Sequence, residues 1–289
     1  MRGIFAESMT VGEAVAWGSS RLDESEHGGR HTRQDSTLLL RHVLGLSQAE
    51  VITERERQLT REETEQFNAA ICERAKGKPI QYIVGQQEFF GLAFRVTPDV
   101  LIPRPETELL VEAAIERLRE HPAPKVVDVG TGSGCIAISL ANALSRADVT
   151  ALDISPAALE IARGNARRNG VESQIRFVTS DLLSAVQSER FDAIVSNPPY
   201  IALSEKKSLP VEVREHEPAQ ALFAGRTGLE LYQRLIVEAA GALNLNGWLL
   251  LEIGHGQRDA IAKLLRDWNQ VEFIDDLQGI PRVAIGKKA

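Results

Sequence analysis

A chain of 289 residues with 43% hydrophobic side chains can bury a large core, in one domain or in two unequal ones. Its net charge of -7 argues against tight, sequence-independent binding to nucleic acid, and no apolar run approaches the roughly 20 residues that span a bilayer. The two distant cysteines and the six histidines show no disulfide framework and no metal-ligand spacing. We therefore expect a cytoplasmic protein without a membrane segment or a metal site.

The first part of the chain, residues 1–78, is predicted to be all helix. Capping boxes, in which Ser or Thr is followed three residues later by Glu, stand at Thr10, Ser47 and Thr60. The segment 32–44 carries three consecutive leucines and ends before a glycine. Successive short helices with one apolar face pack as a small bundle. We expect residues 1–78 to form such a bundle, which could bind a partner.

Between residues 79 and 103 the pattern changes to short apolar runs broken by glycines. The runs 80–85 and 88–96 are predicted to be strands of a β-hairpin that connects the bundle to the rest of the chain. The sequence Pro-Arg-Pro-Glu-Thr-Glu then opens a helix, and its glutamates suit the positive end of the helix dipole. The density of charge in this turn favours a pocket role for Arg104 and Glu106 as much as helix capping.

The remainder, residues 104–289, alternates strands with helices. Strands are predicted at 125–129, 149–152, 174–179, 191–196, 248–253, 271–273 and 282–285. This alternation predicts an α/β domain with a doubly wound, mostly parallel sheet of the Rossmann-like type. In such sheets ligands bind beyond the carboxyl ends of the strands, so the turns that follow the strands are the candidates for a site.

A glycine-rich turn, residues 130–134, follows the first of these strands. Its glycines let the backbone approach a ligand closely. The third glycine of the dinucleotide fingerprint is replaced by Cys135, and the Gly-Lys-Ser/Thr ending of a phosphate-binding loop is absent. The turn therefore indicates a nucleoside-type ligand other than a dinucleotide or a nucleoside triphosphate.

Two aspartates extend this candidate site. Asp153 ends the second strand, where it can accept hydrogen bonds from both hydroxyls of a ribose, and its charge favours a cation such as the sulfonium of S-adenosylmethionine (SAM). Asp181 ends the third strand, where it can accept from the adenine amino group, with Leu182 beside the ring. Together with the glycine turn, these residues predict SAM as the cofactor.

The fourth strand ends in the turn Asn197-Pro198-Pro199-Tyr200. Two consecutive prolines cannot extend a strand, so the turn is stiff. It offers an amide side chain, free carbonyls and a ring, which suit a planar amino group. Our hypothesis is that Asn197 Oδ1 and the Pro198 carbonyl accept the two N–H bonds of a carboxamide and orient its nitrogen toward the methyl donor. Tyr200 would stack on the amide plane.

These motifs resemble those of the bacterial protein-(glutamine-N5) methyltransferases that modify peptide chain release factors, known as PrmC or HemK. The resemblance covers nearly the whole chain and includes the segments 79–83, 101–108, 128–134, 196–200 and 217–222. It implies a class I SAM-dependent methyltransferase domain joined by a β-hairpin to a helical domain that recognises the substrate. The implied substrate is the glutamine of the Gly-Gly-Gln motif in release factors 1 and 2, whose methylation supports translation termination.

The resemblance also implies which residues form the site. SAM is expected to contact Asp128, Gly130, Thr131, Gly132, Ser133, Gly134, Asp153, Asp181, Leu182 and Asn197. The substrate glutamine is expected to contact Arg104, Glu106, Asn197, Pro198, Pro199 and Tyr200, with Asn197, Pro198 and Tyr200 as the catalytic residues. Two positions depart from the family pattern: Leu182 stands where relatives often carry Trp, and Thr227-Gly228 stands where Asp-Gly is usual.

Two other functions fit parts of the sequence. An N6-adenine methyltransferase of DNA or RNA could hold an exocyclic amine in the same turn. Such an enzyme needs a basic groove, and the pair Lys206-Lys207 is too small to form one. The chain could also be a non-catalytic SAM-binding or ribosome-associated protein that works through its helical bundle, but such a protein would not need Asn197 and Tyr200. We therefore expect a monomeric release factor methyltransferase that holds no nucleic acid stably.

Overall fold

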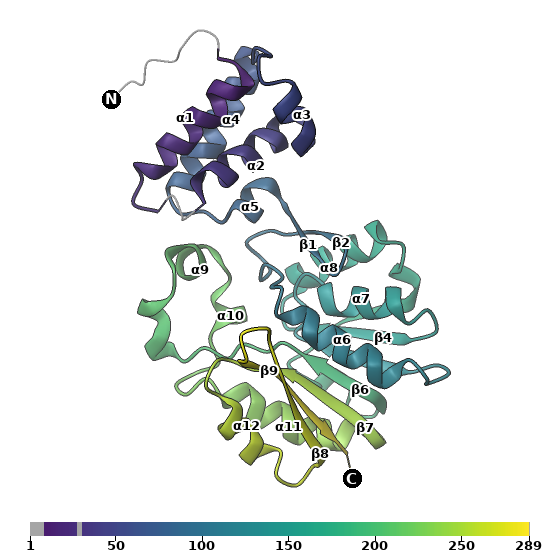
Figure 1. The fold of residues 1–289 in the computed structure, drawn as a ribbon. Helices are drawn as coiled ribbons and strands as arrows, with labels where there is room; N and C mark the ends of the chain where they lie inside the picture. Colours follow the sequence, from purple (N-terminus) through teal and green to yellow (C-terminus); the bar gives the residue numbers. More distant parts are fainter. Residues whose placement is uncertain (1–8, 28–30, 289) are drawn as a thin grey trace. The chain divides into compact units, whose positions relative to one another are not determined.

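The computed structural model describes residues 9–27 and 31–288 (Figure 1). The chain forms two compact units. The first contains the described part of Met1–Gly85 together with Pro210–His216, and the second contains Gln86–Leu209 and the described part of Glu217–Ala289. Within the described ranges, every helix is too short or too polar to cross a bilayer.

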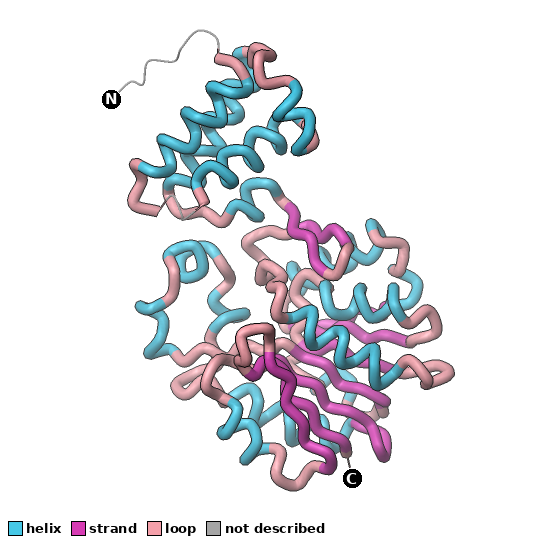
Figure 2. Tube along the Cα trace, viewed as in Figure 1, coloured by secondary structure: helices cyan, strands magenta, loops and turns pink. Residues whose placement is uncertain are grey.

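The first unit is built from helices and loops, as its capping signals predict (Figure 2). Its helices are α1 (Val11–Asp23), α2 (Thr32–Leu44), α3 (Gln48–Thr53), α4 (Arg61–Ala75), α5 (Ile80–Val84) and α9 (Val211–His216). The capping boxes at Thr10, Ser47 and Thr60 are all formed. Apolar faces of α1, α2 and α4 meet in one core that includes Leu39 and Phe67, both almost fully buried.

Helix α9 comes from the loop that follows the Asn-Pro-Pro-Tyr turn, yet it belongs to the first unit. The buried guanidinium of Arg74 accounts for part of this association. Its Nε donates to Asp35 Oδ2 at 2.8 Å and its Nη2 donates to Glu212 Oε1 at 3.3 Å. Two carboxylates thus compensate the burial of the arginine charge, and one of them lies on α9.

The strand predicted at residues 80–85 is wrong, because Ile80–Val84 form α5. Pro79 precedes this helical turn, and Gly85 follows it with a φ of 76°, a left-handed end that glycine favours. Ile80 and Ile83 lie three positions apart and pack on the core of the first unit. An apolar run this short is compatible with a strand or with a helix, and the contact with the core of the first unit selects the helix.

The predicted hairpin is present, but both of its strands lie between residues 86 and 95, mostly within the second predicted run, 88–96. Strands β1 (Gln86–Phe89) and β2 (Leu92–Arg95) pair antiparallel, with Gln86 opposite Arg95. Their two-residue turn, Phe90 and Gly91, has φ values of 52° and 71°, the left-handed pair that a tight hairpin requires.

The second unit is organised around a seven-stranded sheet with the order β5-β4-β3-β6-β7-β9-β8. Its strands are β3 (Lys125–Val129), β4 (Asp148–Asp153), β5 (Ile175–Thr179), β6 (Phe191–Ser196), β7 (Leu243–Glu252), β8 (Asn269–Asp275) and β9 (Pro281–Lys287). Strands β3 to β7 are mutually parallel, and β9 runs antiparallel to both of its neighbours. This confirms the prediction of a mostly parallel, doubly wound sheet.

Helices cover both faces of this sheet (Figure 1). They are α6 (Thr107–Leu118), α7 (Cys135–Ala143), α8 (Pro156–Arg168), α11 (Glu230–Ala242) and α12 (Arg258–Leu264). The short helix α10 (Ala219–Leu222) belongs to neither core of the sheet. Successive residues of β6 point to opposite faces: Ala193 and Val195 join the core that contains α6 and α7, and Ile194 joins the core under α11. The chain runs from β3 through β4 to β5 on one side and then crosses back to β6 on the other side of β3, which opens a crevice at the carboxyl ends of β3 and β6.

Candidate active site

The two turns singled out in the sequence follow neighbouring strands. The glycine turn begins at Gly130 after β3, and Asn197 follows β6, which pairs with β3 in parallel. The Ser196 hydroxyl donates to the Val129 carbonyl at 2.6 Å and ties the two strand ends together. Parallel strands end at the same edge of a sheet, so both turns flank the crevice.

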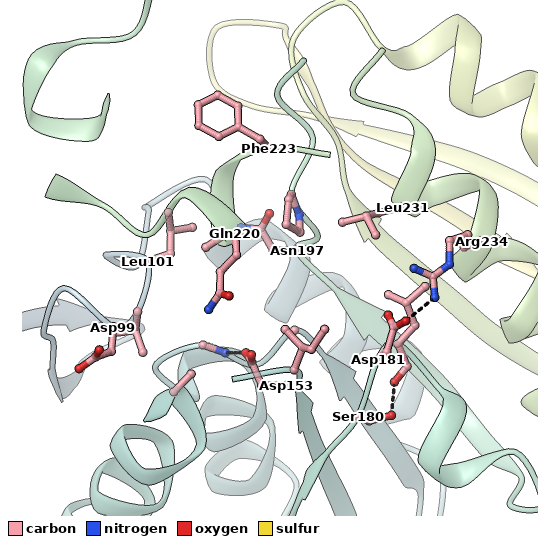
Figure 3. Close-up of a pocket in the computed structure, with 18 residues that line it drawn as sticks. Asp99, Leu101, Asp153, Ser180, Asp181, Asn197, Gln220, Phe223, Leu231 and Arg234 are labelled. Carbon is pink, nitrogen blue, oxygen red and sulfur yellow. Dashed lines mark hydrogen bonds and ion pairs between the residues drawn. The ribbon is translucent and has the colours of Figure 1, made fainter. Parts of the chain in front are cut away.

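A cavity of about 390 Å³ occupies this crevice within the second unit (Figure 3). It is lined by Asp99, Val100, Leu101, Gly130, Gly132, Asp153, Ile154, Ala158, Ser180, Asp181, Leu182, Asn197, Pro199, Gln220, Ala221, Phe223, Leu231 and Arg234. The structure therefore brings parts of the predicted cofactor site and parts of the predicted substrate site to one hollow.

The floor of the cavity has the form that a nucleoside ligand needs. Gly130 and Gly132 have φ values of 77° and 55°, and a Cβ on either would meet no protein atom within 4 Å. The open space above this left-handed backbone is the cavity itself. Asp153 lies at its edge, where Oδ2 accepts from the Gly132 N–H at 2.8 Å and Oδ1 accepts from the Ser155 N–H at 2.9 Å. Burial raises the pKa of the Asp153 carboxyl, and the backbone donors oppose that effect. These residues fit SAM.

Four predicted cofactor residues do not line the cavity: Asp128, Thr131, Ser133 and Gly134. Asp128 is fully buried and accepts from the Thr131 hydroxyl at 2.6 Å and from a backbone N–H of α7, so it braces the turn from within. Burial raises its pKa to about 7. The Ser133 hydroxyl is buried as well. A Cβ on Gly134 would lie 3.2 Å from the Ala162 Cα, so this glycine allows α7 and α8 to pack closely.

At the far side of the cavity, Asp181 forms an ion pair with Arg234, with 2.8 Å between Oδ2 and Nη2 (Figure 3). Leu182 beside it has a φ of 48°, an unusual value for leucine. The Ser180 hydroxyl donates to the Leu182 carbonyl at 2.7 Å and holds this conformation. Sequence reasoning missed Arg234, because nothing local marks an exposed arginine on α11 as the partner of a strand-end aspartate.

The Asn-Pro-Pro-Tyr turn contributes Asn197 and Pro199 to the cavity. Pro198 is buried, and neither it nor Tyr200 is among the lining residues. The Tyr200 ring is half-buried against the core under α11, and its carbonyl accepts from Gln257 Nε2 at 3.0 Å. Burial raises the pKa of Tyr200 to about 12.

Arg104 and Glu106 do not line the cavity either. The Arg104 guanidinium forms an ion pair with Glu217, whose carboxylate is buried and also accepts from the Ile102 N–H at 3.4 Å. This interaction fixes the segment that leads into α10. The Gln220 side chain on α10 extends into the cavity, as Figure 3 shows, and sequence reasoning missed it.

Two further residues stand behind Asn197. Its Nδ2 donates to Thr107 Oγ1 at 3.2 Å, and Thr107 Oγ1 donates to Glu252 Oε2 at 2.6 Å. Sequence reasoning missed both. A signal for Glu252 was present, since it is a carboxylate at the end of the apolar strand that includes Leu249, Leu250 and Leu251. A charge in that position is buried and needs a partner.

The fold and the site define a class I methyltransferase. The family model "Methyltransferase small domain" matches residues 106–214, and the model "PrmC N-terminal domain" matches residues 13–85. A release factor glutamine methyltransferase of Koribacter versatilis is 46% identical over 257 residues, 89% of this chain and 91% of the relative. Another, of Geobacter sulfurreducens, is 38% identical over 286 residues, 97% of this chain and 98% of the relative. The chain belongs to the release factor glutamine methyltransferase family.

Solved structures agree on the fold. A methyltransferase from Pyrococcus furiosus superposes with a TM-score of 0.52 at 22% identity, covering 70% of this chain and 91% of its own. The hMettl16 catalytic domain in complex with a MAT2A 3'UTR hairpin has a TM-score of 0.56 at 18% identity, covering 80% of this chain and 84% of its own. At these identities the likeness concerns the fold alone. The relatives of much higher identity favour glutamine methylation over the adenine alternative.

Proposed function

We propose that this protein transfers a methyl group from SAM to the side-chain nitrogen of a glutamine in peptide chain release factors. One observation carries the proposal: the carboxamide of Asn197 lines the same cavity as the glycine turn and Asp153. A hydrogen-bonding group for the methyl acceptor and a site for the methyl donor are thereby adjacent. The names of the relatives indicate which acceptor the cavity receives.

Five residues of the cavity provide the SAM site in this proposal. Gly130 and Gly132 leave room for the cofactor, and Asp153 accepts from the ribose hydroxyls. Asp181 accepts from the adenine amino group, and Leu182 packs on the ring. When bound, SAM supplies an electrophilic methyl group on a sulfonium. The half-buried Asp153 carboxylate also attracts that positive charge.

The remaining task of the site is to activate a poor nucleophile. The nitrogen lone pair of a carboxamide is delocalised into the carbonyl, so the planar amide resists methylation. Asn197 Oδ1 and the Pro198 carbonyl accept the two N–H bonds and favour a pyramidal nitrogen that points at the methyl group. Positioning of this kind is worth roughly 7–11 kcal/mol of the barrier. The nitrogen gains the methyl group and releases one proton to water, and S-adenosylhomocysteine leaves.

We assign recognition of the partner to the helical domain, residues 1–78, connection to residues 79–103, and transfer to residues 104–289. The match of residues 13–85 to the PrmC N-terminal domain supports a dedicated role for the helical part. The proposed partners are release factors 1 and 2, met in the cytoplasm by a single copy of the chain. Arg104 contributes through its ion pair with Glu217, which sets the position of α10 beside the cavity.

The proposal is tested with methyl-labelled SAM and three acceptors: a release factor, its Gly-Gly-Gln→Gly-Gly-Ala variant, and duplex DNA. Label should enter the release factor alone, and mass spectrometry should place it on the glutamine side chain. Equal labelling of the variant would contradict the assignment of the acceptor. Label in the DNA and not in the release factor would favour the adenine methyltransferase instead.

A further inference from the structure

The two ends of the Asn197 carboxamide differ in chemistry, and only one of them suits the proposed reaction. Oδ1 accepts hydrogen bonds, whereas Nδ2 donates them. A half-turn of the amide plane exchanges the two with almost no change in shape. An Nδ2 that faced the cavity would oppose the N–H bonds of the substrate. The site therefore needs a feature that selects one orientation.

A chain of two hydrogen bonds runs behind Asn197. Nδ2 donates to Thr107 Oγ1 at 3.2 Å, and Thr107 Oγ1 donates to Glu252 Oε2 at 2.6 Å. Thr107 and Glu252 are each only 2% exposed, so bulk water does not compete for these bonds. Thr107 begins α6 and Glu252 ends β7, so neither residue is a neighbour of Asn197 in the sequence.

Glu252 determines which group donates and which accepts in these two hydrogen bonds. An ionised carboxylate can only accept, so Glu252 takes the single proton of the Thr107 hydroxyl. The hydroxyl oxygen then has only lone pairs left to offer, and these attract Nδ2 of Asn197 and repel Oδ1. With Nδ2 turned to Thr107, Oδ1 is the end that can serve the cavity.

We propose that Thr107 and Glu252 are positioning residues that select the end of the Asn197 carboxamide presented to the substrate. The inference rests on the proposed function, because it takes Asn197 to be the acceptor for the target glutamine. It adds to that function a buried pair that never contacts the substrate. The end of β7 does not depend on the pair, because the Tyr232 hydroxyl donates to the Glu252 backbone carbonyl at 2.7 Å.

Two substitutions of Thr107 separate orientation from packing. Thr107→Val keeps the shape and removes the hydroxyl, whereas Thr107→Ser keeps the hydroxyl and removes a methyl group. Thr107→Val removes one hydrogen bond from the Asn197–Thr107–Glu252 network, so its kcat should be about 10-fold lower than that of the wild type. Its KM for the release factor and its Kd for SAM should stay within about 3-fold. Thr107→Ser should keep kcat within about 3-fold of the wild type.

A purely structural role would instead appear as a loss of thermal stability in Thr107→Val, because the buried Glu252 carboxylate loses its partner, with the kcat of the folded protein unchanged. Wild-type kcat in Thr107→Val would overturn the inference. If the wild type itself fails to methylate the release factor, the proposed function fails, which is a different result. The two failures are therefore distinguishable.

The wild-type protein offers a second test that does not depend on how a variant folds. Side-chain amide protons of Asn197, assigned by NMR through their loss in Asn197→Ala, should exchange with solvent more slowly than those of the exposed Asn269. An Nδ2 bonded to a buried hydroxyl is protected. Exchange as fast as that of Asn269 would show that Nδ2 faces the cavity, which would overturn the inference.

Discussion

A Cβ placed on Gly228 would lie 2.4 Å from the carbonyl oxygen of Tyr200. Gly228 has a φ of 79°, which disfavours any other residue independently of that contact. Gly228→Ala should therefore displace the turn that carries Asn197. We expect the free energy of unfolding to fall by about 1–3 kcal/mol. We expect kcat to fall about 10-fold, because the carboxamide of Asn197 moves. Thermal unfolding and steady-state kinetics measure the two effects.

Gly241→Ala is the matched control. Gly241 lies within α11, its φ is not in the left-handed region, and a Cβ there meets nothing within 4 Å. Alanine is the better helix former by about 0.5–1 kcal/mol, so this variant should be slightly more stable and fully active. A Gly228→Ala variant with normal kcat would show that the turn tolerates the displacement.

The sequence predicted the parts of the site that lie next to strand ends. Buried strands such as 191–196 are continuous apolar runs, and a glycine or a polar residue directly after such a run belongs to the ligand edge of the sheet. Gly130, Asp153 and Asn197 were found in this way, and all three line the cavity. Their positions follow from local pattern and topology together.

The residues that were missed reach the site from elsewhere in the fold. Arg234 and Gln220 lie on helices, and their contribution depends on how those helices pack at the crevice. Thr107 was seen only as part of a helix start. The wrong strand at 80–85 has the same origin. This apolar run fits a strand or a helix, and contacts with the core of the first unit select the helix.

Asp153→Ala should weaken SAM binding more than catalysis. The substitution removes the acceptor for the Gly132 N–H and the proposed partner of the ribose hydroxyls. Loss of charge-assisted hydrogen bonds predicts a Kd for SAM about 10-fold higher or more, with kcat at saturating SAM within about 3-fold. Calorimetric titration with SAM measures the first effect.

Asp148→Ala is the control for this prediction, because Asp148 begins the same strand, β4, and is exposed. It should bind SAM as the wild type does. An Asp153→Ala variant with unchanged affinity would remove Asp153 from the cofactor site.

Asn197→Ala, in contrast to Asp153→Ala, should weaken catalysis more than SAM binding. It removes the acceptor for the target nitrogen and leaves the glycine turn and Asp153 in place. Turnover of the release factor should fall about 100-fold or more, and the Kd for SAM should stay within about 3-fold. Asn269→Ala, at an exposed position of β8, serves as the control. Near-normal turnover in Asn197→Ala would mean that this side chain is not the acceptor.

The carboxyl of Glu252 should make kcat depend on pH. Burial raises its pKa to about 7, and the Thr107 hydroxyl opposes that effect. Glu252 interacts electrostatically with six other titratable or charged groups: Glu106, Arg104, Arg282, Tyr200, Tyr232 and Cys135. Below its pKa the carboxyl is protonated and can donate to Thr107 Oγ1. Thr107 can then donate to Asn197 Oδ1, which turns Nδ2 toward the cavity. We therefore expect kcat to rise with pH through about 7 and to level off above it.

Glu252→Gln should abolish this acid limb of the kcat profile, because a carboxamide does not titrate there. Asp128 also has its pKa raised to about 7, but it braces the glycine turn, so its protonation should appear in the KM for SAM. Initial rates of the wild type and of Glu252→Gln are measured from pH 6 to pH 9 at saturating release factor. These profiles extend at least about one pH unit on either side of the pKa and separate the titration of Glu252 from that of Asp128. An acid limb that persists unchanged in Glu252→Gln would assign the titration to another group, and the carboxylate would then have no part in orienting Asn197.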